Sequence, residues 1–202
     1  MLPRPPVMLI TDAAQAVLPL ETIIDQTLMA GCRWIMLRDH AADDRSFLTQ
    51  AQRIQIQCKN YEARFFISRR AAIAKQIGAD GIHLSATQNI KDVRALCGSI
   101  LIGQSCHNSN DVADAQKSGT DYVSLSPIFE TQSKPGYGPA LGLERLAQIC
   151  SSNTLPIIAL GGINAKNAAA CQRAGAKGIA IMGEMMRSAD PLETMRLFLS
   201  HN

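Results

Sequence analysis

The chain has 202 residues, of which 47% are hydrophobic and 18% are charged, and its formal net charge is +3. These values are typical of an ordinary globular protein, so we expect residues 1–202 to form a single domain. The small and evenly spread charge does not predict nucleic-acid binding. No apolar run approaches the roughly 18 residues that span a membrane, and the first residues lack the pattern of a secretory signal. The expected compartment is therefore the cytoplasm.

Short apolar segments alternate with amphipathic, alanine-rich segments along the chain. Most of the apolar segments are short and continuous, as expected for parallel strands that are covered by helices. In chain order, the expected strands are Val7–Thr11, Trp34–Arg38, Arg64–Ser68, Gly81–Ser85, Ile100–Ser105, Tyr122–Pro127, Pro156–Leu160 and Gly178–Met182.

Helical patterns lie between these segments. A helix is expected over Ser46–Tyr61, where apolar residues recur at helical spacing. Another is expected over Pro191–Leu199, because Asp190 and Pro191 form a good cap and first turn. Glycine ends a helix with little strain, and four glycines are expected at helix-to-strand junctions: Gly31, Gly78, Gly119 and Gly175.

The repeated strand-and-helix unit is compatible with a closed barrel or with an open, doubly wound sheet. A count of about eight strands favours the barrel. The first strand is also not followed by the Gly-x-Gly-x-x-Gly turn of a dinucleotide-binding sheet. We therefore expect a single-domain α/β protein with a (β/α)8 TIM-barrel fold.

The active site of such a barrel lies at the carboxyl ends of the strands. Gly161 and Gly162 follow the seventh expected strand, and Gly183 follows the eighth. Barrels often bind phosphate at this place, through backbone N–H groups that glycine leaves accessible. The sequence therefore predicts a phosphate site there, although Gly161 and Gly162 could also serve only to turn the chain tightly.

Several motifs, in order along nearly the whole chain, resemble the thiamine phosphate synthase and TenI family. They are Leu37-Arg38, Gly78-Ala-Asp-Gly-Ile-His-Leu84, Ile102-Gly-x-Ser105, Pro127-Ile-Phe-x-Thr131-x-Ser-Lys134, Ala159-Leu-Gly-Gly-Ile163 and Gly178-Ile-Ala-Ile-Met182.

The resemblance implies a (β/α)8 barrel that handles a thiazole phosphate. The synthase couples this ligand to hydroxymethylpyrimidine diphosphate with Mg²⁺ and releases pyrophosphate, whereas the TenI branch aromatises a thiazole phosphate carboxylate tautomer without a metal. Arg38, Ser105 and Lys134 are then expected to face the pyrophosphate. The residues expected to hold the thiazole phosphate are Thr131, Ser133, Gly161, Gly162 and Gly183.

The chain departs from the synthase pattern where the metal ligands are expected. Ser68-Arg69 stands where the pattern has Asn-Asp, and Gln88 stands at the place of a further Asp. Mg²⁺ is normally held through one or two carboxylates together with substrate phosphates. We therefore expect no metal site of the usual kind and predict no firm cofactor. Arg69 would instead place a cation where the metal is expected.

The residue that moves protons is left open by the sequence. TenI-like enzymes use a histidine at the end of the sixth strand, where this chain has Pro127. His40 and His107 lie at expected strand ends and could be catalytic or ordinary polar lining. Cys106 and His107 point to opposite faces of an extended strand, so a nucleophile–base pair is not expected. His83 is expected to be a structural histidine.

Two classes of function remain open at this point. The first is an enzyme of thiamine biosynthesis that acts on a thiazole phosphate, by coupling or by tautomerisation, with Arg69, Arg38 and Lys134 in place of Mg²⁺ in the coupling case. The second is a non-catalytic binder of a phosphorylated thiamine precursor, or a salvage-associated protein. The expected ligands are a phosphorylated thiazole and, for coupling, a pyrimidine diphosphate. A homo-oligomer is not excluded.

Overall fold

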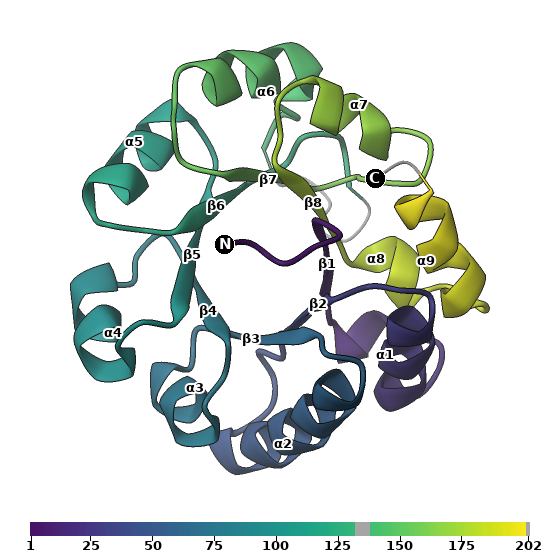
Figure 1. Ribbon diagram of the computed structural model, residues 1–202. Coiled ribbons are helices and arrows are strands. Elements are labelled where there is room, and N and C mark those ends of the chain that lie inside the picture. The colour runs from purple at the N-terminus through teal and green to yellow at the C-terminus, as the bar shows by residue number, and fades with distance from the viewer. Residues whose placement is uncertain (132–137, 201–202) are drawn as a thin grey trace.

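A computed structural model describes residues 1–131 and 138–200. Eight parallel strands form a closed barrel in which each strand pairs with its neighbours in chain order, and β8 pairs with β1 (Figure 1). The expected (β/α)8 barrel is confirmed. The strands are β1 (Val7–Ile10), β2 (Trp34–Leu37), β3 (Arg64–Ser68), β4 (Gly81–Leu84), β5 (Leu101–Cys106), β6 (Tyr122–Leu125), β7 (Ile157–Leu160) and β8 (Gly178–Ile181).

The helices form a ring around the barrel (Figure 1). They are η1 (Ala13–Gln15), α1 (Leu20–Met29), α2 (Asp44–Asn60), α3 (Ala71–Ile77), α4 (Ile90–Cys97), α5 (Ser109–Lys117), α6 (Gly142–Ser151), α7 (Ala168–Arg173), α8 (Gly183–Met186) and α9 (Pro191–Leu199). Helix α2 begins two residues before the expected start, because the Asp43 side chain accepts hydrogen bonds from the N–H groups of Arg45 and Ser46. Helix α9 has the expected bounds, with Asp190 as its cap.

Two apolar layers hold the barrel together. The outer layer lies between strands and helices, and the inner layer fills one end of the barrel with three buried aromatic rings from β2, β3 and β6. The ring centroids of Trp34 and Tyr122 are 5.3 Å apart, in an edge-to-face arrangement. A Cβ atom at Gly81 or Gly103 would overlap the rings of Phe66 or Tyr122. These two glycines make room for the three rings, which form an apolar plug at one end of the barrel. The carboxyl ends of the strands remain for the site.

The junction glycines confirm the expected helix ends. Each has a positive φ, at which other residues are strained: +111° at Gly31, +63° at Gly78, +82° at Gly119 and +100° at Gly175. Within residues 1–131 and 138–200, no helix is both long enough and apolar enough to cross a membrane.

Candidate functional site

A cavity of about 420 Å³ opens at the carboxyl ends of the strands. Residues at the carboxyl ends of all eight strands contribute to its lining, as expected for the site of such a barrel. The predicted site residues that line it are Arg38, His40, Arg69, Ser105, His107, Thr131 and Gly161. Gly162 and Gly183 do not line it, but each is adjacent in the chain to a lining residue, Gly161 and Met182. Ser133 and Lys134 lie outside the described residues.

The glycine side of the cavity is made by backbone that packs tightly. Gly161 and Gly162 have φ values of +95° and +64°. A Cβ atom at Gly161 would lie 2.8 Å from Cα of Pro127, and one at Gly162 would overlap the carbonyl oxygen of Glu130. The N–H of Phe129 donates to the carbonyl of Gly161 at 3.0 Å. Both glycines are therefore required by the fold of this loop, and phosphate binding by them stays a prediction.

Arg38 enters the cavity from the end of β2 and is held from behind. Its Nη1 lies 3.1 Å from Oδ2 of Asp12, and 21% of its side chain is exposed. The Thr11 hydroxyl accepts from the N–H of Arg38 at 2.9 Å and donates to its carbonyl at 3.1 Å. The guanidinium is therefore fixed in direction by the residues that follow β1, and the same Nη1 lies 3.8 Å from the sulfur of Met182 in the cavity wall.

The floor of the cavity is the buried His83. Its Nδ1 lies 3.1 Å from the hydroxyl of Tyr122, and its Nε2 lies 3.2 Å from Oγ of Ser105 and 3.1 Å from Oγ of Ser124. Burial lowers the pKa of His83 to about 4, and the positive charge of Arg69 acts in the same direction. The ring is therefore neutral and fully hydrogen-bonded, as expected for a structural histidine, and it also faces the cavity.

His107 follows β5 and lines the cavity, whereas its neighbour Cys106 faces the outer apolar layer. The predicted opposite orientation is confirmed, and burial raises the pKa of the Cys106 thiol to about 12. Nδ1 of His107 lies 2.8 Å from the carbonyl oxygen of Ser126. Because a carbonyl oxygen only accepts, Nδ1 carries the hydrogen, and Nε2 is the basic atom of the neutral ring. His40 is exposed at the rim.

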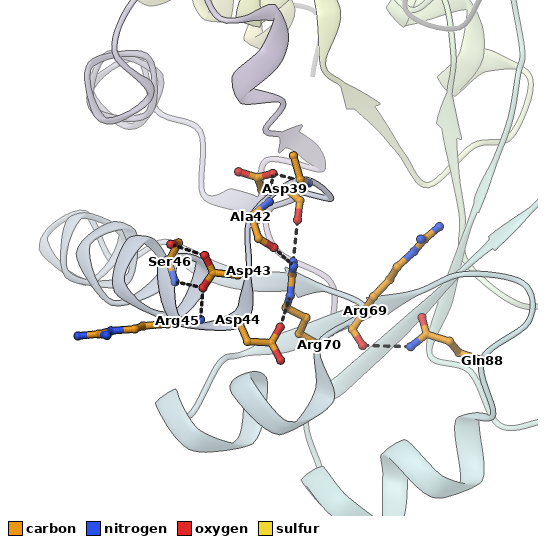
Figure 2. A network of polar contacts seen from close by, with 10 residues as sticks. Asp39, Ala42, Asp43, Asp44, Arg45, Ser46, Arg69, Arg70 and Gln88 are labelled. Atoms are coloured by element: carbon orange, nitrogen blue, oxygen red, sulfur yellow. Dashed lines mark hydrogen bonds and ion pairs between the residues drawn. The ribbon is translucent and has the colours of Figure 1, made fainter.

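Two adjacent arginines at the end of β3 have different surroundings. Arg70 donates to Oδ1 of Asp44 at 2.8 Å and to the carbonyl of Asp39 at 2.7 Å, and its guanidinium lies 4.1 Å from the centre of the Phe47 ring. Arg69 extends away from this network and lines the cavity (Figure 2). Within residues 1–131 and 138–200, no hydrogen bond or ion pair engages the guanidinium of Arg69. Its charge is available to a ligand.

Five apolar residues of the lining were not singled out as site residues by sequence reasoning. They are apolar side chains at strand ends: Ile10, Met36, Leu84, Leu160 and Met182. All but Leu84 pack with the inner layer and could have been found from the strand alternation, because inward-facing residues near the carboxyl end of a barrel strand must line the mouth.

A family model described as thiamine monophosphate synthase matches residues 7–185, which include all eight strands. The chain belongs to the thiamine monophosphate synthase family. The resemblance seen in the sequence motifs is thereby confirmed.

Three known proteins illustrate the family match. A thiamine-phosphate synthase of Prochlorococcus marinus (strain AS9601) is 36% identical over 179 residues, which are 88% of this chain and 51% of that protein. A putative thiamine-phosphate synthase of Geobacter sulfurreducens is 35% identical over 195 residues, 95% of this chain and 92% of that protein. The solved thiamine phosphate pyrophosphorylase from Pyrococcus furiosus has a TM-score of 0.87 and 26% identity, covering 96% of this chain and 93% of that one. The chain thus spans about half the length of the Prochlorococcus relative.

The residues that line this cavity do not fit the Mg²⁺ site that the family resemblance implies. No aspartate or glutamate is among the described residues that line it. Within the described part of the chain, no group of three or more histidine, cysteine or acidic side chains is arranged to hold a metal. At the two places where the resemblance implies carboxylates, the sequence has Arg69 and Gln88. A guanidinium repels Mg²⁺, and one neutral amide is a weak substitute for a carboxylate.

Proposed function

We propose that this chain couples a thiazole phosphate to hydroxymethylpyrimidine diphosphate, giving thiamine phosphate and pyrophosphate, and that arginine side chains replace Mg²⁺ at the diphosphate. The observation that carries the proposal is the composition of the cavity. Two arginines reach it from different strand ends, and no carboxylate is among the described residues that line it. The names of the relatives at 36% and 35% identity support the same reaction class.

The chemistry of coupling suits such a cavity. The thiazole nitrogen attacks the methylene carbon of the pyrimidine, a C–N bond forms, and the C–O bond to the diphosphate breaks. Pyrophosphate leaves with the electron pair, so negative charge builds on its oxygens, and no proton has to leave the attacking nitrogen. Guanidinium groups bind phosphate oxygens through paired N–H donors, and fixed cations at a developing charge accelerate a reaction.

In this proposal, different walls of the cavity bind the two substrates. Arg69 and Arg38 face the diphosphate. The ion pair between Arg38 Nη1 and Asp12 Oδ2, at 3.1 Å, orients the Arg38 guanidinium. The loop of Gly161 and the hydroxyl of Thr131 hold the thiazole phosphate at the opposite wall. Holding both reactants in one cavity of about 420 Å³ turns an encounter in solution into a reaction between oriented neighbours.

The test is an assay of thiamine phosphate formation in the presence of a chelator, with three proteins compared. The unchanged chain should form product, and Arg69→Asp should be slower by about 10²-fold, because it replaces a stabilising charge with a repelling one. Arg53→Asp makes the same change of net charge on the exposed face of α2 and should keep full activity. Unchanged activity of Arg69→Asp would refute the role of Arg69.

A second candidate, tautomerisation of a thiazole phosphate carboxylate, is favoured by one observation. The Ser126 carbonyl fixes the hydrogen of His107 on Nδ1, which makes Nε2 the atom that would accept a proton from one ligand atom and return it to another. His107→Gln should abolish tautomerisation and spare coupling. Tight binding of thiazole phosphate without product in either assay would support the binding-only alternative.

A further inference from the structure

The backbone at Arg69 has an unusual conformation. Its φ is +67°, in the left-handed region that residues with a side chain rarely adopt. The N–H of Arg70 donates to the carbonyl of Ser68 at 2.9 Å, which closes a three-residue turn centred on Arg69. A γ-turn with positive φ is the rarer and more strained of the two forms.

A second three-residue turn follows at once. The N–H of Ala71 donates to the carbonyl of Arg69 at 3.1 Å, and Arg70 at its centre has φ −84° and ψ 79°, the relaxed form of γ-turn. Two successive turns of opposite sense send neighbouring side chains in different directions. Arg70 reaches the loop between β2 and α2, and Arg69 reaches the cavity (Figure 2).

The strained turn is held in place by Gln88 from the next loop of the barrel. Its Nε2 donates to the carbonyl oxygen of Arg69 at 3.0 Å (Figure 2). Its Oε1 accepts from the N–H of Ser85 at 3.0 Å, which fixes the amide at its other end. The N–H of Arg69 donates to the carbonyl of His83 at 2.9 Å. Both backbone polar groups of Arg69 are thus tied to the β4 side.

We infer that Gln88 is a positioning residue that holds the Arg69 turn so that the guanidinium binds the diphosphate group of the ligand. The inference rests on the proposed function and deepens it, because it treats the two residues at the expected metal-ligand positions as one substitute unit. A left-handed arginine costs free energy, and its exposed side chain gains no hydrogen bond or ion pair from the described residues in return. A ligand contact accounts for that cost.

The test is the affinity for inorganic pyrophosphate, measured by calorimetry with a chelator present. Arg69→Ala should weaken binding about tenfold or more, as expected for loss of a charge-assisted contact. Gln88→Leu should weaken it about threefold to tenfold, and Gln88→Glu, which keeps an acceptor for Ser85 but loses the donor to Arg69, should also weaken it. Arg53→Ala is the control with matched charge and should bind like the unchanged chain.

The combined variant separates positioning from general loosening. In the Arg69→Ala background, Gln88→Leu should have no further effect on pyrophosphate affinity, because the two residues act as one unit. Affinity for thiazole phosphate should stay the same in all variants. Independent, additive losses, or an unchanged affinity of Gln88→Leu and Gln88→Glu, would overturn the inference. Pyrophosphate binding with this coupling but without thiamine phosphate formation would refute the proposed reaction and leave the positioning role standing.

Discussion

The two sides of the cavity mouth are built in different ways. On the side of β7, backbone lies against backbone, and Gly161 and Gly162 pack under the first residues that follow β6. On the side of β2 to β4, the wall is made of charged and polar side chains such as Arg38 and Arg69. Where backbone packs against backbone, almost no residue can replace the glycines. Where side chains form the wall, substitutions can change its charge and leave the barrel unchanged.

This difference is compatible with a chain that belongs to its family and has Arg69 and Gln88 where the resemblance implies metal ligands. The barrel, the glycine loops and the apolar plug depend on packing. In the proposed function, the residues at positions 69 and 88 are set by the ligand that the mouth binds. The predictions below test this contrast, from the largest expected effect to the smallest.

Gly162→Ala should have the largest effect, on the backbone-built side. The added Cβ would overlap the carbonyl oxygen of Glu130, and the backbone would be strained at φ +64°. We expect a loss of about 3 kcal/mol or more in the free energy of unfolding and a loss of thiazole phosphate binding. Denaturant unfolding and calorimetry would measure the two effects.

Gly119→Ala is the matched control for that variant. Its φ is +82°, but no atom lies within 4 Å of the added Cβ. It should therefore show only the cost of left-handed backbone, about 1 kcal/mol. Equal losses in the two glycine variants would contradict the tight packing of the mouth.

The buried His83 should make stability depend on pH. Its pKa is about 4 in the folded chain, against an ordinary value of 6.5, so between these values the unfolded chain binds a proton that the folded chain does not. The free energy of unfolding should therefore fall as the pH drops from 6.5, by roughly 3 kcal/mol at pH 4. Unfolding curves of His83→Gln across this range should lack that decline, and parallel profiles would refute the assignment.

Arg70→Ala should cost about 2 kcal/mol of stability. It removes the hydrogen bonds to Asp44 and to the loop between β2 and α2, together with the contact over the Phe47 ring. The same loop carries Arg38 and His40, so ligand affinity should fall with it. Thermal unfolding would check the stability effect, and a change below about 0.5 kcal/mol would show that the network is not formed in solution.

Arg69→Gly should have the smallest and opposite effect on stability. Glycine accepts the φ of +67° at Arg69 without strain. The free energy of unfolding should therefore stay the same or rise by up to about 1 kcal/mol, and the unfolding temperature should follow it. Pyrophosphate affinity should fall in the same protein. A clear loss of stability would mean that the arginine side chain supports the fold.

Much of the fold was predictable, because it depends on local signals. Eight apolar segments and four junction glycines were enough to indicate the barrel, and Asp190 marked the start of α9. The start of α2 was placed too late, since the prediction followed the apolar spacing from Phe47 and ignored the cap that Asp43 provides. Cap chemistry acts before the first apolar residue of a helix.

Part of the cavity lining was predictable from the sequence, and its geometry was less so. Strand-end residues such as Arg38, Arg69 and His107 do meet in one cavity. The different roles of Arg69 and Arg70 depend on two γ-turns and on a side chain of another loop, Gln88. Such contacts between distant segments leave no periodic pattern, so adjacent arginines look alike in the sequence.

The most direct test of the account is the rate of thiamine phosphate formation from both substrates, measured with a chelator and then with increasing Mg²⁺. The account predicts product in the chelator and little change when Mg²⁺ is added, because Arg69 and Arg38 carry the charge of the leaving pyrophosphate. Product formed only with Mg²⁺ would contradict it, as would the absence of product under both conditions.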